Sequence, residues 1–110
     1  MIKLKSATLY KGLFLISSFL AMTLQPLWAH SCDGIPDEEC SALYALYHST
    51  NGDQWTDNSN WLSSTPVNDW FGIRTGDGHV RSIMISHNNL TGSIPPELGD
   101  LKGLEFLAIS

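Results

Sequence analysis

The feature that most constrains this chain is a repeat of 24 residues near its carboxyl end. Three apolar residues recur there with the same spacing: Val80, Ile83 and Ile85 return as Leu104, Leu107 and Ile109. A fixed period of about 20–29 residues is typical of a solenoid, in which each repeat forms one coil beside the next. Residues 80–110 therefore predict one complete coil and the opening of a second. We expect residues 104–109 to lie parallel to a short strand at residues 81–85.

The residues after this strand predict how the coil closes. Its core is expected from apolar side chains in a regular order: Val80, Ile83, Ile85, Leu90, Ile94, Leu98 and Leu101. Asn88 stands where the chain leaves the strand, and its side chain can bond backbone groups that the turn leaves unpaired. Gly92 allows a tight or positive-φ bend. Pro95 and Pro96 favour an extended or helix-starting segment, so residues 97–101 form at most one short helical turn.

These residues carry a resemblance to a known family. The stretch NNLTGSIPPELGDLKGLEFL resembles the plant-type subclass of leucine-rich repeats, whose pattern includes N-x-L-x-G-x-I-P-x-x-L-x-x-L. The matching residues are Asn88, Leu90, Gly92, Ile94, Pro95, Leu98 and Leu101. The preceding stretch, from ALYALYHSTNGDQW to DWFGI, looks like the N-terminal cap of such repeats. The resemblance implies an α/β leucine-rich-repeat solenoid fragment: a helical cap with a short hairpin, then about one and a half repeats with parallel strands.

One departure from the family pattern bears on the source of the chain. In plant members a cysteine pair often flanks the W-x-G-[VI] segment, and residues 64–75 supply no cysteine. The departure fits the bacterial secreted proteins that resemble this subclass better than it fits a plant receptor.

The first 29 residues are typical of a secretory signal peptide. Three lysines and no acid precede an apolar run at residues 12–24, which Pro26 ends, and Ala29 offers a small residue for cleavage. The run is short for a bilayer of roughly 30 Å, although an uncleaved anchor and a lipid-modified Cys32 stay open as alternatives. The expected organisation is a signal peptide at 1–29, the N-terminal cap at 30–79 and truncated leucine-rich repeats at 80–110. The exact cleavage site stays open.

Charge narrows the partners of the mature chain. Residues 30–110 hold three strong bases and eleven acids, a net charge of −8. Nucleic acids and anionic lipid surfaces both require basic protein surface, so we expect neither nucleic acid nor, after signal cleavage, membrane as a partner. The expected location is secreted, periplasmic or extracellular.

The two cysteines, Cys32 and Cys40, both follow the predicted cleavage site. In an oxidising compartment we expect them to form a disulfide that pins the mature N-terminus to the first helix. Loop closure over so short a segment stabilises the fold by about 2–3 kcal/mol. The seven residues between them fit neither a redox C-x-x-C motif nor a zinc site, and no metal site or cofactor is expected.

The cap is expected to begin with a helix at residues 36–50. Pro36 suits the first helical position, and Asp37, Glu38 and Glu39 suit the positive end of the helix dipole. Asn51-Gly52 is a stop signal. The loops that follow are polar but contain Trp55, Trp61, Trp70 and Phe71, which we interpret as anchors that cover the end of the solenoid. A stacking platform for sugar is the alternative.

A hairpin is expected to lead from the cap into the first repeat. Residues 70–73 are predicted as its first strand, residues 75–78 as its turn and residues 79–86 as the returning strand.

The resemblance implies a binding module that recognises protein or glycan on the concave strand face. The predicted binding residues there are Arg81, Met84, Ser86, His87 and Phe106, and further outward positions are Ser82, Glu105, Ala108 and Ser110. We expect no enzyme activity, because no catalytic motif is present and the four histidines are dispersed. Two other hypotheses stay open: the beginning of the ectodomain of a receptor or enzyme, and a non-functional truncated product.

The second coil is expected to have an open side, because each repeat buries its core against the next and at least three are usually needed. The chain is therefore interpreted as a fragment, a truncated reading frame or the start of a longer protein. Self-association through the open C-terminal repeat is the competing hypothesis.

Overall fold

The computed structural model describes residues 31–110; the predicted signal peptide at 1–29 lies outside the described residues. The elements follow in the order α1 (Asp37–Ser49), η2 (Gly52–Gln54), η3 (Val67–Asp69), β1 (Ile73–Gly76), β2 (His79–Met84), η4 (Pro96–Asp100) and β3 (Phe106–Ala108). The fold is thus a small α/β structure with one α-helix and a three-stranded sheet. No helix within residues 31–110 has the length and apolar character needed to cross a membrane.

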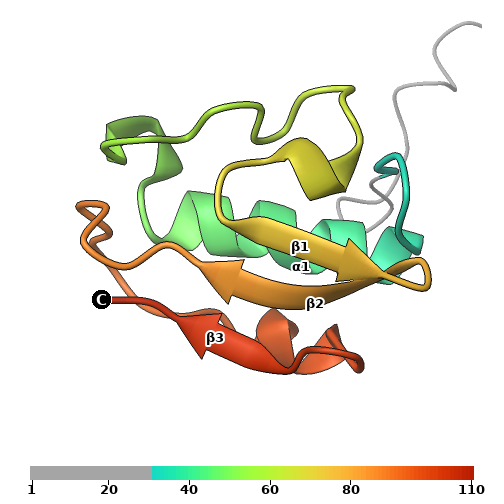
Figure 1. The fold of residues 1–110 in the computed structure, drawn as a ribbon. Helices are drawn as coiled ribbons and strands as arrows, with labels where there is room; N and C mark the ends of the chain where they lie inside the picture. The colour runs from blue at the N-terminus through green and yellow to red at the C-terminus, as the bar shows by residue number, and fades with distance from the viewer. Residues whose placement is uncertain (1–30) are drawn as a thin grey trace, which may run out of the picture.

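The sheet has the strand order β1-β2-β3, and Figure 1 shows β3 at its open edge. The strands β1 and β2 form an antiparallel hairpin, whereas β2 and β3 run parallel. Ser82 pairs with Phe106 and Ile83 with Leu107, which are displacements of 24 residues. The parallel arrangement predicted from the 24-residue period is therefore confirmed.

A β-bulge explains the uneven spacing of the apolar residues in β2. The ladder between β1 and β2 changes register between Arg74 and Thr75, which leaves Arg81 as an extra residue in β2. Strict alternation would place Val80 and Ile83 on opposite faces of the sheet. Because a bulge inserts one residue, both side chains reach the interior and both are fully buried.

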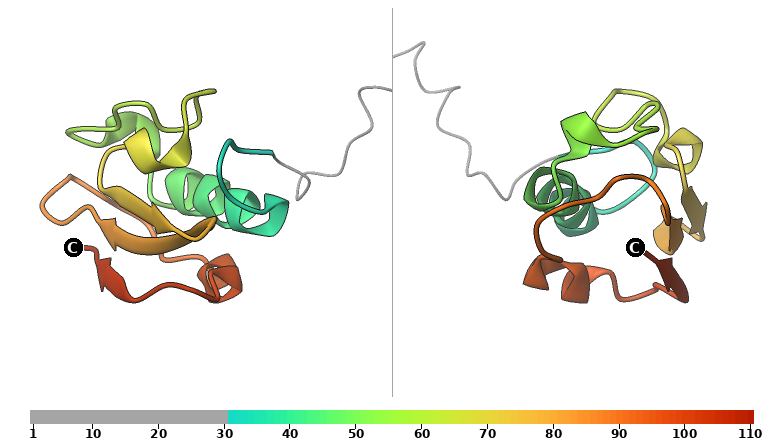
Figure 2. Two further views of the ribbon diagram at one scale, coloured as in Figure 1. Left: turned by 45° about the vertical axis from the view of Figure 1, so that its right-hand side comes forward. Right: turned by 90° about the vertical axis from the view of Figure 1, so that its left-hand side faces the viewer.

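The core lies between α1 and the sheet. Leu43 and Leu46 of α1 belong to the same buried cluster as Ile83 of β2, and Figure 2 shows the helix on one side of the strands. We call the opposite side of the sheet the outer face. It carries the residues that alternate with the core positions and their register partners: Arg74, Ser82, Met84, Phe106 and Ala108.

The ends of α1 differ slightly from the prediction. Pro36 occupies the N-cap with an extended conformation, so the helix starts at Asp37 and not at Pro36. Asn51 adopts the left-handed conformation (φ 57°) directly after the C-cap Thr50, as the stop signal predicts.

Glu39 has a role that the sequence did not indicate. Its side chain is 2% exposed, and its two carboxylate oxygens lie 2.8 Å from the backbone N of Val80 and 2.7 Å from Nδ1 of His79. The interpretation of Glu39 as a helix-dipole residue was therefore incomplete, because this carboxylate also joins α1 to the first residues of β2. The neighbouring Asp37 and Glu38 remain exposed in the first turn.

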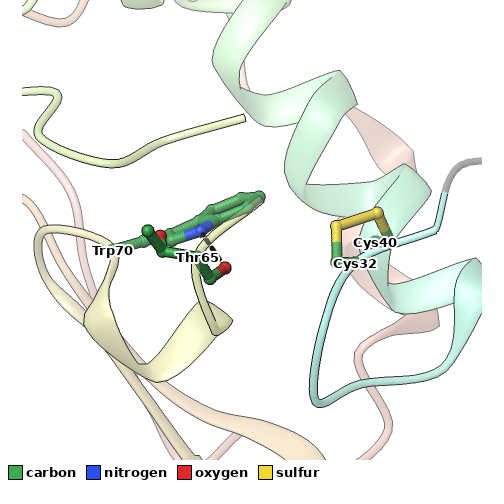
Figure 3. The surroundings of a disulfide bond; sticks show 4 residues. All are labelled: Cys32, Cys40, Thr65 and Trp70. Atoms are coloured by element: carbon green, nitrogen blue, oxygen red, sulfur yellow. Dashed lines mark hydrogen bonds between the residues drawn. A yellow bond between two sulfur atoms is a disulfide. The ribbon is translucent and has the colours of Figure 1, made fainter. Parts of the chain in front are cut away.

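The predicted disulfide between Cys32 and Cys40 is present, with a distance of 5.6 Å between the two Cα atoms. Figure 3 shows how it ties the segment before the helix to the first turn of α1. Cys40 is fully buried, so the bridge fixes that segment against the core.

The aromatic residues between α1 and β1 form a buried cluster. Trp55, Trp61 and Trp70 are 5%, 7% and 2% exposed, and neighbouring ring centroids lie 4.8–5.4 Å apart. Each indole N–H donates to a backbone carbonyl, as Figure 3 shows for Trp70 and Thr65. The interpretation of these tryptophans as structural anchors is confirmed. The alternative of a stacking platform for sugar finds no support, because all three rings are buried.

Three further details differ from the prediction. The hairpin begins at Ile73, because residues 70–72 form a turn after η3, and its own turn is confined to Asp77 and Gly78, both with positive φ (55° and 79°). The returning strand ends at Met84 and not at Ser86. Ile94, expected in the core, is 48% exposed, since no described segment packs over it.

The loop after β2 is fastened to the segment that follows α1. The buried Asn88 accepts a hydrogen bond from the N–H of Asp57 (2.7 Å) and donates to its carbonyl (2.8 Å). Asn88 thus bonds backbone groups, as predicted, but these groups belong to Asp57 and not to the turn that Asn88 itself begins. Gly92 has φ +91° and lies so close to the carbonyl of Ser49, at the end of α1, that any Cβ would overlap it.

Candidate functional site

The outer face carries two large, exposed apolar side chains. Met84 of β2 is 57% exposed and Phe106 of β3 is 66% exposed. Methionine and phenylalanine are enriched in the centres of protein interfaces, and methionine adapts its shape to different partners. These two residues were predicted at the site, and the structure places them on the same side of the sheet, on adjacent strands.

A pocket of about 400 Å³ adjoins Met84 at the β1 side of this face. It lies where η3, the start of β1 and the end of β2 meet, and its lining residues are Asn68, Trp70, Gly72, Ile73, Arg74 and Met84. Asn68 accepts a hydrogen bond from the backbone N–H of Thr75 (2.8 Å), which fastens η3 to the edge of β1. This hydrogen bond fixes the position of η3 against β1, the two elements that carry Asn68 and Arg74. Most ligand sites are likewise largely pre-formed.

Arg74 is the cation of this pocket. Its side chain is exposed and makes no ion pair with any residue of 31–110. Arg81, by contrast, donates to the carbonyls of Gly76 and Gly103 at 3.2 Å each. Two carboxylates also lie near Arg81, those of Asp77 at 3.5 Å and Glu105 at 3.9 Å. Arg81 therefore serves the structure of the sheet, whereas Arg74 is free to meet a ligand.

Ser82 lies beneath the outer face between two larger neighbours. Its register partners are Arg74 on β1 and Phe106 on β3. Ser82 was expected among the outward, exposed positions, but it is only 6% exposed. Its hydroxyl has no hydrogen-bond partner among the described residues. A buried hydroxyl without a partner is uncommon in folded proteins and calls for an explanation.

The remaining predicted residues lie at the margin of this face. Ser86 and His87 are exposed, but they follow the end of β2, and the N–H of His87 donates to Oγ of Ser110 (3.1 Å). The structure therefore brings Met84 and Phe106 together, ties Arg81 into the fold, and leaves Ser86 and His87 to one side.

The prediction from sequence missed Asn68 and Arg74, and it named Trp70 only as an anchor or a stacking ring, not as part of a pocket. Their contribution depends on the hairpin register, which places Arg74 opposite Ser82. The alternation of Ile73 and Arg74 was the available signal, but the strand was predicted to begin three residues too early.

Metal ligands do not gather in the described part of the chain: residues 31–110 contain no group of three or more His, Cys, Asp or Glu side chains arranged to hold an ion. The outer face and its pocket together offer the guanidinium of Arg74, the amide of Asn68 and the hydroxyl of Ser82, which can bind a ligand by charge and hydrogen bonds.

Two curated proteins are similar to the chain. The S-cell enriched with leucine-rich repeat-containing protein slrA of Dictyostelium discoideum is 30% identical over 93 residues, which are 84% of this chain and 6% of that protein. Receptor-like kinase TMK4 of Arabidopsis thaliana is 33% identical over 72 residues, 66% of this chain and 7% of that protein. No protein-family model and no solved structure matches.

These similarities support a relationship to leucine-rich-repeat proteins. They cover less than a tenth of each relative, so they do not extend to the activity of either whole protein. Both relatives are eukaryotic, and the preference for a bacterial secreted type stays a prediction.

Proposed function

We propose that this chain is a protein-recognition module that binds its partner on the outer face of the sheet. The observation that carries the proposal is the exposure of Met84 and Phe106 on one face, beside a pocket of about 400 Å³. Leucine-rich-repeat relatives support protein binding in general. A protein partner is favoured over a glycan, because Trp55, Trp61 and Trp70 are buried, whereas the exposed Met84 and Phe106 are residue types enriched at protein interfaces.

The test uses the full chain as bait for a random dodecapeptide library displayed on phage. Selected peptides are then titrated against Met84→Ala, Phe106→Ala and the control Ile94→Ala, which removes an exposed apolar side chain that does not belong to the outer face. We expect the first two variants to weaken binding about tenfold or more and the control to change it less than twofold. Equal affinity for all variants would contradict the proposal.

The proposal includes export from the cytoplasm. It is supported by the disulfide between Cys32 and Cys40, because such bonds persist in oxidising compartments, and by the signal-like residues 1–29. Expression of the intact gene followed by mass analysis of the external fraction tests it. A chain that starts near His30 with its disulfide formed is expected, whereas an intact, reduced chain inside the cell would contradict export.

A second candidate is that the module begins the ectodomain of a receptor. The observation that favours it is the similarity to a receptor-like kinase. The coding sequence downstream of Ser110 tests it. Further repeats followed by a membrane span support a receptor, and their absence in every frame excludes it.

Self-association is a further part of the proposal. The strand β3 is an edge of the sheet, and its Phe106 and Leu107 are 66% and 49% exposed. An exposed apolar edge strand is a template for pairing with another chain.

A further inference from the structure

Three features of the outer face meet at one point. Arg74 and Ser82 are opposite each other across the β1–β2 ladder, and Phe106 is opposite Ser82 across the β2–β3 ladder. One cation without an ion pair and one buried hydroxyl without a partner are therefore neighbours on the same side of the sheet. The guanidinium of Arg74 has no anionic partner, and the hydroxyl of Ser82 has no hydrogen-bond partner, so an acceptor could satisfy both.

The charge of the chain makes this pair unusual. Residues 31–110 contain only three strong bases, Arg74, Arg81 and Lys102, against eleven acids. Arg81 is held by backbone carbonyls. Arg74 therefore stands as a local positive charge on an acidic protein, and it lies at a pocket wall. A ligand that carries a negative charge meets its complement there and is repelled by most of the remaining surface.

We propose that Arg74 and Ser82 form a carboxylate-binding subsite and that its occupant is an acidic side chain of an extended peptide. This proposal rests on the proposed function of the outer face and names the partner's chemistry. The guanidinium donates two parallel N–H bonds to a carboxylate, and the Ser82 hydroxyl donates a third to the same group. Ser82 is 6% exposed and does not line the pocket, so binding requires its neighbours Arg74 and Phe106 to move. Both side chains are exposed, and rotamer changes of interface side chains are common on binding.

The spacing along β2 predicts the sequence of the peptide. Ser82 and Met84 are two residues apart on one face of a strand, a separation of about 6.6 Å. Side chains i and i+2 of an extended peptide have the same separation. A peptide that lies along β2 with its acid at Ser82 therefore brings the side chain two positions away to Met84 and the pocket. The expected motif is an acidic residue, any residue, and a large apolar residue, in either chain direction.

Substitution of Ser82 distinguishes a role in ligand binding from a role in stability. A buried hydroxyl without a partner costs free energy in the unbound protein. Ser82→Ala removes that cost and is expected to leave the melting temperature unchanged or raised. The same substitution removes one donor to the ligand, so it is expected to weaken binding of the acidic peptide about three- to tenfold. A merely structural serine would not produce this opposite pair of effects.

The experiment uses the full chain and the peptides selected in the library described above. Each peptide is made with an amidated C-terminus, with its acid replaced by the amide, and with a free C-terminus but no acidic side chain. The affinity is measured by fluorescence anisotropy for the unaltered chain, Arg74→Gln, Ser82→Ala and the control Lys102→Gln, which removes the same charge from an exposed site outside the pocket.

We expect replacement of the acid by its amide and Arg74→Gln each to weaken binding about tenfold or more, and Lys102→Gln to change it less than twofold. Selected peptides without an acidic residue, or equal losses in Arg74→Gln and Lys102→Gln, would overturn the subsite. Affinity that depends on the free C-terminus alone would overturn the side-chain assignment. An oligogalacturonate serves as an acidic oligosaccharide that carries carboxylates but no peptide backbone. If it binds in an Arg74-dependent manner while no peptide binds, the assignment of a peptide as the partner is overturned.

These results also separate the two proposals. Binding that depends on Met84 and Phe106 but not on Arg74 or Ser82 leaves the proposed function standing and removes the subsite. Binding that depends on none of the four removes both.

Discussion

Single polar side chains hold together segments that are far apart in the sequence. Asn88 of the first repeat bonds both backbone groups of Asp57, 31 residues earlier. Glu39 of α1 bonds the N–H of Val80, 41 residues later. Both side chains are buried, so each satisfies backbone groups that would otherwise be costly to bury.

Replacement of Asn88 by aspartate tests this contact with almost no change of shape. The carboxylate keeps the acceptor but cannot donate to the carbonyl of Asp57. We expect Asn88→Asp to lower the free energy of unfolding by about 1–3 kcal/mol, measured by urea titration. The matched control is Asn89→Asp. The exposed amide of Asn89 donates to the carbonyl of Gln54, and the loss of this hydrogen bond should lower the free energy of unfolding by less than about 1 kcal/mol. Equal effects would contradict the role of Asn88.

The environment of the Tyr47 phenol leads to a prediction of how stability changes at alkaline pH. Burial of the side chain raises the pKa of its phenol, and so does the nearby carboxylate of Asp53, which accepts the phenolic hydrogen bond at 2.7 Å. The folded state therefore keeps the proton at a pH where the unfolded chain begins to lose it. Below pH 10 this stabilisation is fully present, and it is lost as the pH rises through the folded pKa.

The test compares the unaltered chain with Tyr47→Phe between pH 8 and pH 11. We expect the stability advantage of the unaltered chain, measured as the difference in urea midpoint, to shrink above pH 10. A difference that stays constant through this range would show that the environment of Tyr47 does not favour its neutral form.

At the scale of elements, the repeat docks against the carboxyl end of α1. The N–H groups of Thr91 and Ser93 donate to the carbonyls of Thr50 (3.2 Å) and Ser49 (3.3 Å). These carbonyls lie at the carboxyl end of the helix, where carbonyl groups have no hydrogen-bond partner within the helix. The loop after β2 thus caps α1, and Gly92, which lies between Thr91 and Ser93, permits the close approach.

Gly92→Ala is expected to disrupt this docking. The added Cβ meets the carbonyl oxygen of Ser49, and the positive φ strains any side chain. We expect a loss of at least about 2 kcal/mol in the free energy of unfolding, measured by urea titration. Gly99→Ala is the control, because its Cβ meets no atom within 4 Å and the change should stay within about 0.5 kcal/mol. Similar losses in both variants would contradict the docking argument.

At the scale of the whole molecule, the two edges of the sheet differ. The edge of β1 is covered in part by η3 through Asn68. Among the described residues, no strand pairs with the free edge of β3. Leu107 points toward the same side as the core residue Ile83 and is still 49% exposed. Figures 1 and 2 show this strand at the margin of the molecule.

We expect the chain to self-associate through β3. Light scattering after size-exclusion chromatography should give a mass that rises with concentration, and Leu107→Lys should return it to that of one chain, because a charge on an edge strand opposes pairing. Ile94→Lys, which adds the same charge at an exposed apolar residue outside the three strands, is the control and should give the same masses as the unaltered chain. A monomer at every concentration would contradict the prediction.

Much of the architecture could be predicted because its signals are local or periodic. The 24-residue period was sufficient for the parallel pairing of β2 with β3, since residues with the same place in a repeat have the same place in a coil. Asn51 marked the end of α1 because asparagine tolerates positive φ, and two cysteines shortly after the predicted cleavage site indicated their own bond.

Other features were decided by tertiary structure alone. The partners of Asn88 and Glu39, the bulge at Arg81, and the meeting of Arg74 with Ser82 all join segments that share no period. Such contacts depend on the register between two strands and on the distance between layers, and a shift of one residue would turn every side chain to the other face. The sequence by itself therefore determined the parallel pairing of β2 with β3, and the register of β1 on β2 determined the candidate site.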